Sequence, residues 1–316
     1  MTLALPTPSA PLRIGTRGSP LALAQAHETR DRLMAAFDLP AEAFDVRVIQ
    51  TTGDRVQDRA LKELGGKGLF TREIEQAMLE RGIDIAVHSM KDMPVLQPAG
   101  LVLDCYLPRE DVRDAFVSFH EGGIAAIPEG ARVGTSSLRR GAQMKLRRPD
   151  VEIVEFRGNV QTRLRKLGDA VAHCTFLAQA GLNRLGRADV PAQALEPEEM
   201  LPAIAQGAIG VERRADDLRV AEMLAAIHDA PTGELLAAER AFLAALDGSC
   251  ETPIAGLAVV EGGTLRLRGQ ILRPDGSEAL EDDSSAPVED GAALGAEMAR
   301  RLLDRAGAGF FDWRGA

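Results

Sequence analysis

The sequence predicts an α/β fold divided among two or three domains. Short apolar stretches alternate with segments whose apolar residues recur at helical spacing, as in strands connected by helices. The chain has 316 residues, which is too long for one ordinary hydrophobic core. From about Thr232 the pattern changes to a helix, a pair of strand-like stretches and a final helix, so a small α+β unit is expected at that end.

The first strand and helix are indicated by local signals. Leu12 to Thr16 is a short apolar strand. Ser19 is placed to cap the next helix, with Pro20 at its first position, where a missing N–H costs nothing. We expect this helix to run to about Phe37 and a second strand to span Phe44 to Gln50.

A helix and a buried strand precede the first candidate for chemistry. Residues 70–78 carry apolar side chains at helical spacing, and Ile83 to Val87 reads as a short buried strand that Pro94 prevents from continuing far. Lys91 and Asp92 are therefore expected in a loop just beyond the carboxyl end of a strand. Ligands bind at that edge in open α/β sheets.

The middle of the chain repeats this arrangement. A strand around Val133 leads into a hydroxyl-rich helix start at residues 134–140, and a strand from Val151 to Phe156 ends at Arg157 before another short amphipathic helix. In the C-terminal part, we expect a helix ending near Leu246, strands at 254–260 and 265–272, a hairpin turn at 275–276 and a helix over about 291–305.

Composition and charge exclude several classes of protein. A net charge of −10 argues against general binding to nucleic acid or to an anionic membrane. No apolar stretch approaches the roughly 18 residues of a membrane span, and the N-terminal residues lack the basic start of a secretory signal. The three cysteines are widely spaced without a Cys-x-x-Cys pair, so neither a zinc site nor a disulfide framework is indicated. A cytoplasmic protein is expected.

The positive charge is concentrated in one segment. Residues 131–166 hold ten basic and three acidic side chains, a net +7 within an acidic chain, which suggests a local anion site. Five arginines fall at strand ends or in first helical turns, where backbone N–H groups also favour anions; they are Arg17, Arg139, Arg140, Arg157 and Arg163. Together they describe a site for a ligand with several carboxylates or phosphates; the alternative is a solvated face with ordinary salt bridges.

Two further residues are candidates for chemistry. Asp92 is either a general acid/base or cation stabiliser, or an ordinary turn cap, and the neighbouring His88 is expected to be a core histidine. Cys250 follows Gly-Ser after a helix, which suits a reachable nucleophile, whereas Cys105 and Cys174 lie in apolar stretches and are expected in the core. The segment 65–68, Gly-Gly-Lys-Gly, fails the phosphate-loop pattern and is interpreted as a glycine-rich lid.

At this point the sequence resembles the porphobilinogen deaminase family. The resemblance runs, in the family's order, from about Arg13 to beyond Pro253. It is carried by the motifs Arg17-Gly18-Ser19-Pro20-Leu21-Ala22-Leu23, Gly65-Gly66-Lys67-Gly68-Leu69-Phe70, Ala86-Val87-His88-Ser89-Met90-Lys91-Asp92, Val133-Gly134-Thr135-Ser136-Ser137-Leu138-Arg139-Arg140, Arg157-Gly158-Asn159-Val160, Ala180-Gly181-Leu182-Asn183-Arg184-Leu185-Gly186 and Gly248-Ser249-Cys250.

The resemblance implies a fold of three domains. Residues 1–107 and 206–228 would form domain 1 and residues 108–205 domain 2, both doubly wound α/β domains of the type II periplasmic-binding-protein form with the active cleft between them. Residues 229–316 would form a small α+β domain 3 that carries Cys250 on a loop facing the cleft. A monomer is expected from the resemblance alone.

The resemblance also implies the reaction. Cys250 would hold a dipyrromethane cofactor by a thioether bond. The enzyme, a transferase of tetrapyrrole biosynthesis, would add four porphobilinogen molecules head to tail with loss of ammonia, then release hydroxymethylbilane by hydrolysis. Asp92 would stabilise the cationic azafulvene left by ammonia and move protons.

The arginines acquire roles from the same resemblance, because each pyrrole carries an acetate and a propionate. Arg17, Arg157, Arg163 and Arg184 would bind the substrate. Lys91, Thr135, Ser137, Arg139 and Arg140 would hold the cofactor, with Ser19 beside them. Two departures from the family pattern are His173, where an acid is expected, and Gly18, in place of a larger residue.

Two other functions compete with this one. A non-catalytic anion-binding module would share the fold but would need neither Cys250 nor a third domain, and would normally be exported with a signal. A nucleic-acid binder would use the basic segment, but only Phe156 interrupts it as an aromatic residue and the overall charge opposes it. We therefore expect porphobilinogen as the partner, with no nucleic acid and no membrane.

Overall fold

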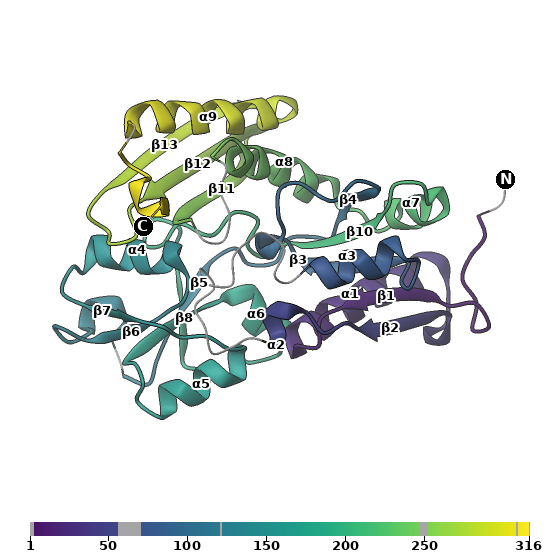
Figure 1. Cartoon of the computed structure of the whole chain (residues 1–316), viewed down its shortest axis with the longest axis horizontal. Helices are drawn as coiled ribbons and strands as arrows, with labels where there is room; N and C mark the ends of the chain where they lie inside the picture. The colour runs from purple at the N-terminus through teal and green to yellow at the C-terminus, as the bar shows by residue number, and fades with distance from the viewer. Residues whose placement is uncertain (1–2, 56–70, 121, 247–251, 308, 316) are drawn as a thin grey trace. The chain divides into compact units, whose positions relative to one another are not determined.

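The computed structural model describes residues 3–55, 71–120, 122–246, 252–307 and 309–315. Two compact units are present among them. Unit 1 contains the described residues up to 110 together with 207–233, and unit 2 contains 111–206 and the described residues from 234 onward. Figure 1 shows the elements of both units in chain order.

Unit 1 is built on a five-stranded mixed sheet. Its strand order is β2 (Phe44–Val48), β1 (Leu12–Thr16), β3 (Ile85–Ser89), β10 (Ile209–Arg214) and β4 (Leu101–Tyr106). The strand β1 is parallel to β2 and β3, whereas β10 is antiparallel to both β3 and β4. The chain returns to this sheet through β10 after building the five-stranded sheet of unit 2.

Helices cover both faces of this sheet. The core under α1 (Pro20–Phe37) and α7 (Leu218–Ala225) includes Ile85 and Val87 of β3, while α3 (Arg72–Leu79) packs on Ala86 from the opposite face. Successive residues of a strand point to opposite faces, which explains this alternation. The short helix α2 spans Thr52–Arg55.

Unit 2 contains a second five-stranded sheet with the same topology. Its order is β7 (Glu152–Val154), β6 (Arg132–Gly134), β8 (Cys174–Ala178), β5 (Asp114–Ser118) and β9 (Ala192–Leu195). The strand β6 is parallel to β7 and β8, and β5 is antiparallel to β8 and β9. Again the antiparallel strand is the first one formed after the chain crosses from the other unit.

The helices of this second sheet are α4 (Leu138–Arg147), α5 (Val160–Gly168) and α6 (Gln179–Arg184). Met144 of α4 joins the core on one face, and Leu167 of α5 with Leu182 of α6 joins the core on the other. The sheet is therefore doubly wound. The fold class predicted from the sequence, α/β with two doubly wound sheets and a small C-terminal α+β part, is confirmed.

The C-terminal part is a three-stranded antiparallel sheet with two helices. The strands β11 (Ile254–Glu261), β12 (Thr264–Leu272) and β13 (Ala279–Pro287) follow one another in order. The helices are α8 (Ala230–Ala245) and α9 (Gly291–Ala306), and α9 packs on β12 and β13 (Figure 1). The helices approach each other so closely that a Cβ at position 295 would lie 2.2 Å from the Ala238 carbonyl oxygen, so only glycine fits there.

Single 3₁₀ turns complete the described secondary structure; they are η1 (Ala41–Ala43), η3 (Met90–Asp92), η4 (Ile124–Ala126), η5 (Val288–Asp290) and η6 (Asp312–Gly315). In the described residues, every helix is too short or too polar to span a membrane.

Several predicted elements are confirmed at their predicted bounds, including β1 and the α1 helix. Ser19 accepts a hydrogen bond from the Ala22 N–H at 3.2 Å, so it is the expected cap. The predicted strand at 83–87 is shifted by two residues, because β3 pairs with β10 as far as Ser89. The strand β13 was not predicted, since its alternating acidic and small residues do not have the composition of a typical strand.

Candidate functional site

Asp92 lies on a short turn at the carboxyl end of β3, as predicted. Residues 90–92 form the 3₁₀ turn η3, in which the Met93 N–H donates to the Met90 carbonyl at 3.2 Å. Asp92 is exposed and Lys91 is half-buried. The carboxylate is therefore presented to solvent from a turn whose backbone is closed by its own hydrogen bond.

The turn is attached to the sheet at the residues just before Asp92. Met90 is buried and its N–H donates to the Ala208 carbonyl at 3.0 Å. Its side chain lies over Gly210 of β10, where an added Cβ would be 2.2 Å from the Met90 sulfur. Ser89 exchanges two hydrogen bonds with the Gln25 amide of α1, at 2.8 and 3.0 Å. These contacts fix where the Asp92 turn begins.

His88 is attached on the other side of β3. Its Nε2 lies 3.2 Å from Oε2 of Glu212 on β10, and both side chains are buried. The expectation that His88 is a core histidine is confirmed, but its carboxylate partner was not foreseen.

Arg17 and Ser19 lie at the equivalent edge of the neighbouring strand β1. Both are half-buried, and the Ser19 hydroxyl oxygen accepts the helix-capping hydrogen bond described above. Gly18 between them is exposed; a Cβ there would approach the Val48 side chain to 3.1 Å. The carboxyl ends of β1 and β3 thus carry all four of the predicted site residues in unit 1.

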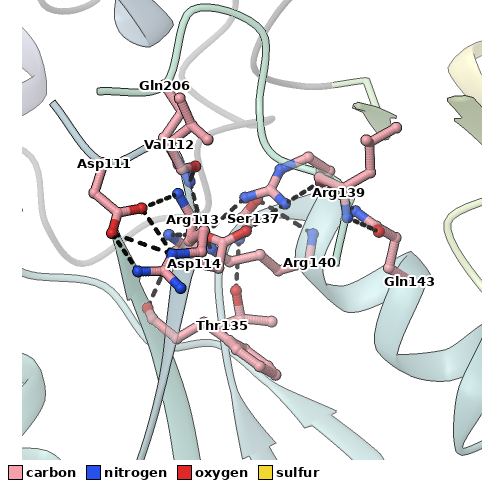
Figure 2. A network of polar contacts seen from close by, with 12 residues as sticks. Asp111, Val112, Arg113, Asp114, Thr135, Ser137, Arg139, Arg140, Gln143 and Gln206 are labelled. Atoms are coloured by element: carbon pink, nitrogen blue, oxygen red, sulfur yellow. Dashed lines mark hydrogen bonds and ion pairs between the residues drawn. The ribbon is translucent and has the colours of Figure 1, made fainter. Parts of the chain in front are cut away.

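In unit 2 the central feature is a buried ion cluster around Asp114, shown in Figure 2. Asp114 is the first residue of β5 and has no exposed surface. Arg139 donates to its two oxygens at 2.7 and 3.1 Å, and Arg140 donates twice to Oδ1 at 2.9 and 2.7 Å. The amide of Gln206 adds a fifth contact at 3.2 Å.

The electrostatics of this cluster follow from its composition. Burial raises the pKa of Asp114, but the charges and hydrogen bonds of Arg139 and Arg140 outweigh this and hold the pKa far below its ordinary value. The two guanidinium groups also donate to the Leu201 and Phe176 carbonyls, at 2.8 and 2.9 Å. Asp114 therefore stays ionised and anchors two arginines that would otherwise repel each other.

One donor of this cluster is left over. The Nε of Arg139 is buried and has no hydrogen-bond partner among the described residues. A buried charged group rarely leaves a donor unsatisfied without a reason. The sequence predicted that Arg139 and Arg140 hold carboxylates of a cofactor, and this unsatisfied donor fits an anionic ligand.

The hydroxyl groups next to these arginines organise the start of α4. The Ser137 hydroxyl oxygen accepts from the Arg140 N–H at 3.4 Å, and the Thr135 hydroxyl oxygen accepts from the Ser137 N–H at 3.1 Å. Each hydroxyl acts here as an acceptor, so its own proton remains to be donated.

The remaining predicted arginines of unit 2 follow the next strands of the sheet. Arg157 follows β7, and Arg163 lies in the first turns of α5, where its Nε donates to the Gly158 carbonyl at 3.0 Å. Arg184 is the last residue of α6, which follows β8. All three are half-buried. Every predicted site residue that the structure describes thus lies beyond the carboxyl end of a parallel strand.

The predicted residues fall into two sets that belong to different units. Lys91, Asp92, Arg17 and Ser19 are in unit 1, and the others are in unit 2. Cys250 and the proposed glycine-rich lid at 65–68 lie outside the described residues. Cys105 and Cys174 are buried as predicted, and burial raises the pKa of each thiol to about 12.

Sequence reasoning missed two residues of these sites, Asp114 and Glu212. Asp114 begins the mostly apolar strand β5, and Glu212 directly follows the apolar residues of β10; an acidic residue beside apolar strand residues is the signal that points to a buried partner. The described residues contain no group of three or more His, Cys, Asp or Glu side chains that could hold a metal ion.

Two family models match this chain. "Porphobilinogen deaminase, dipyromethane cofactor binding domain" matches residues 12–222, and "Porphobilinogen deaminase, C-terminal domain" matches residues 234–304. A curated porphobilinogen deaminase from Paracoccus denitrificans (strain Pd 1222) is 67% identical over 309 residues, which cover 98% of this chain and 99% of that protein.

Solved structures with a similar fold are more distant. The periplasmic VFT2 domain of BvgS from Bordetella pertussis is 12% identical with a TM-score of 0.40, over 68% of this chain and 86% of that one. The probable amino-acid ABC transporter extracellular-binding protein ytmK from Bacillus subtilis is 12% identical with a TM-score of 0.42, over 71% of this chain and 94% of that one.

The two family models together extend over most of the chain, and the curated relative matches nearly its whole length. The expected transferase activity, its place in tetrapyrrole biosynthesis and the dipyrromethane cofactor are confirmed by these matches. The chain belongs to the porphobilinogen deaminase family.

Proposed function

We propose that Asp92 is the catalytic residue with which this chain joins porphobilinogen units on a primer attached to Cys250. The observation that carries this assignment is the exposed carboxylate on a turn that begins from two anchored residues, Ser89 on Gln25 and Met90 on the Ala208 carbonyl. Because the backbone that carries this carboxylate is already fixed, little entropy is lost when the carboxylate is oriented toward a substrate. A catalytic group that is positioned in advance lowers the activation barrier in this way.

The chemistry asks two things of that carboxylate. Loss of ammonia leaves a positively charged substrate, and a fixed negative charge stabilises the transition state that leads to it. In the coupling step, the cationic substrate forms a bond to a carbon of the terminal pyrrole, and that same carbon then loses its proton. Asp92 carries its negative charge close to the reacting ring and is the group that accepts or returns this proton.

The cofactor-binding role belongs to six other residues. When bound, the dipyrromethane supplies the terminal pyrrole to which the first substrate unit is joined. Arg139 offers its unsatisfied Nε to a cofactor carboxylate, and Arg140 adds positive charge beside it. Thr135, Ser137 and Ser19 retain hydroxyl protons to donate, and Lys91 adds a cation from the Asp92 turn.

The substrate's acetate and propionate groups are assigned to the other arginines. Arg157, Arg163 and Arg184 follow successive strands of one sheet, and Arg17 follows β1 of the other. Guanidinium groups suit this task because each can donate two parallel hydrogen bonds to one carboxylate.

Several arginines of the basic segment already have partners within the protein, which weighs against a role of these residues in nucleic-acid binding. Arg139 and Arg140 are buried on Asp114, Arg148 pairs with Asp150 at 2.7 Å, and Arg147 donates to the Glu198 carbonyl. We propose further that the chain acts as a cytoplasmic monomer with domains at 1–107 with 206–228, 108–205 and 229–316. The three separate sheets support this division.

Replacement of Asp92 by asparagine tests the catalytic assignment. Because the side chain is exposed, Asp92→Asn should fold and load its cofactor normally, while kcat falls by about a hundredfold or more. Asp104→Asn is the matched control, since Asp104 is an exposed aspartate of the same unit that pairs with Arg213. Turnover by Asp92→Asn at the rate of the control would remove Asp92 from its role.

A further inference from the structure

Unit 1 buries a group of titratable side chains that the mechanism above does not use. His88 on β3, Glu212 on β10 and Glu75 on α3 are all at least nine-tenths buried. Oε2 of Glu212 lies 3.2 Å from His88 Nε2, and Oε1 of Glu212 has no hydrogen-bond partner among the described residues. A buried carboxylate with a single neutral or weakly basic partner costs folding free energy, so packing alone does not explain it.

The location of the pair suggests what it does. His88 lies opposite Gly210 in the β3–β10 register, and Met90 packs on that same glycine. The hydrogen bond therefore joins the two strands near the carboxyl end of β3, one residue before the final β3–β10 pair of Ser89 with Ile209. Only three residues separate His88 from Asp92. A rotation of the β3 backbone at His88 would therefore also change the position of the Asp92 turn.

A second acid, Glu75, lies in the buried surroundings of Glu212. Burial raises the pKa of Glu75 above its ordinary value, and the negative charge of Glu212 adds to the rise, while His88 and Arg72 oppose it. Glu75 thus holds its proton more readily than an ordinary glutamate. The next residue of β10, Arg213, pairs with Asp104 of β4.

We propose that Glu212 is a positioning residue for the reaction, acting through His88 to fix the end of β3 and thereby the Asp92 turn. This inference rests on the proposed role of Asp92. It assigns to β10, the strand on which the chain returns to unit 1, a part in aligning the catalytic carboxylate. Glu212 itself touches neither the turn nor a substrate group.

Two substitutions separate this role from simple packing. Glu212→Leu fills similar space but cannot accept the His88 hydrogen bond. Glu212→Gln keeps an oxygen acceptor and loses only the charge. We expect Glu212→Leu to lower kcat by about ten- to a hundredfold while KM for porphobilinogen stays within about twofold, because misalignment affects the chemical step more than binding. Glu212→Gln should recover most of that loss.

The measurement is steady-state kinetics on holoenzyme, with cofactor loading checked by intact mass and folding checked by urea unfolding. Asp104→Asn serves as the control from the adjacent strand β4. Wild-type kcat in fully loaded, folded Glu212→Leu would overturn the proposal, as would an equal loss in Glu212→Leu and Glu212→Gln. If Glu212→Leu does not fold, His88→Leu and Glu212→Gln decide: kcat must fall in the first, which removes the hydrogen bond, and persist in the second.

Asp92→Asn measured in the same series keeps the two assignments distinct. Retained turnover in Asp92→Asn contradicts the catalytic assignment whatever Glu212 does. Lost turnover in Asp92→Asn with normal turnover in Glu212→Leu contradicts only the positioning role.

Discussion

The two five-stranded sheets of this protein have the same topology but treat a buried carboxylate in opposite ways. In each sheet the antiparallel strand lies between the third and fourth parallel positions and is the first strand formed after the chain crosses between units. Each of these strands carries one acidic side chain with no exposed surface, Asp114 on β5 and Glu212 on β10.

The partners of the two carboxylates differ. Asp114 receives hydrogen bonds from two guanidinium groups and from the amide of Gln206. Among the described residues, the Glu212 side chain has one hydrogen-bond partner, His88, and a second acid, Glu75, is near it. Unit 2 therefore holds two arginines in fixed positions around one buried carboxylate. Unit 1 has a buried acid in the same sheet as β3, the strand that leads into the turn of Asp92, our proposed catalytic residue.

The largest effect on stability is expected from removal of the unit 2 anchor. Asp114→Asn leaves Arg139 and Arg140 buried without a counter-charge, so the free energy of unfolding should fall by about 3–5 kcal/mol in urea titrations. Asp111→Asn is the matched control, because Asp111 pairs with Arg113 in a partly exposed position, where about 1 kcal/mol or less is expected. Equal effects from both substitutions would contradict the distinction between the two sheets.

A smaller effect is expected where Met90 packs on β10. Gly210→Ala places a Cβ 2.2 Å from the Met90 sulfur, and the displaced side chain should cost about 1–3 kcal/mol and reduce kcat. Gly168→Ala is the control, since nothing lies within 4 Å of that Cβ and alanine favours the helix. A Gly210→Ala enzyme with normal stability and turnover would show that the Asp92 turn is not held in this way.

The smallest effect is a change in how stability depends on pH. The raised pKa of Glu75 means that the folded state binds its proton more tightly than the unfolded state does. The contribution of Glu75 to stability is therefore present at low pH and is lost as pH rises through the raised value. The Glu75→Gln protein has no titrating group at this position, so it does not lose this stability as the pH rises.

Urea unfolding over a pH series measures this difference. The stability of Glu75→Gln relative to wild type should increase as the pH rises above the ordinary pKa range of glutamate. For Asp114 the dependence of stability on pH has the opposite sign. Because its pKa is lowered in the folded state, the ionised side chain stabilises the fold above the ordinary pKa range of aspartate, and this stabilisation is lost only on acidification. A constant difference between Glu75→Gln and wild type at all pH values would contradict the shared acidic environment of Glu75 and Glu212.

Local signals predicted those elements whose boundaries depend on nearby residues. The strand β1 and the helix α1 begin and end where Ser19, Pro20 and the apolar pattern indicate. The strand β3 was displaced by two residues because its end is set by pairing with β10, which comes more than a hundred residues later. The acidic edge strand β13 has no apolar pattern to reveal it.

Site residues were predictable where their location depends on neighbouring residues in the sequence. Lys91 and Asp92 were expected beyond a strand because of Pro94, and the structure places them there. The partners of the buried groups were not predictable. Whether Arg139 pairs with Asp114 or faces solvent depends on which strand enters the sheet beside β8, and nothing near Arg139 in the sequence records that choice.

The central claim is that a primer attached to Cys250 is extended by Asp92 while the guanidinium groups hold its carboxylates. Intact-mass spectrometry before and after adding porphobilinogen tests it most directly. Wild type should exceed its polypeptide mass by two linked pyrrole units, and it should gain further single units when substrate is added. Asp92→Asn should keep the two-unit increment without gaining more, and Cys250→Ala should show no increment at all. The buried-thiol control Cys105→Ala should behave as wild type. A Cys250→Ala protein that carries the two-unit increment, or an Asp92→Asn protein that gains units as wild type does, would contradict the account.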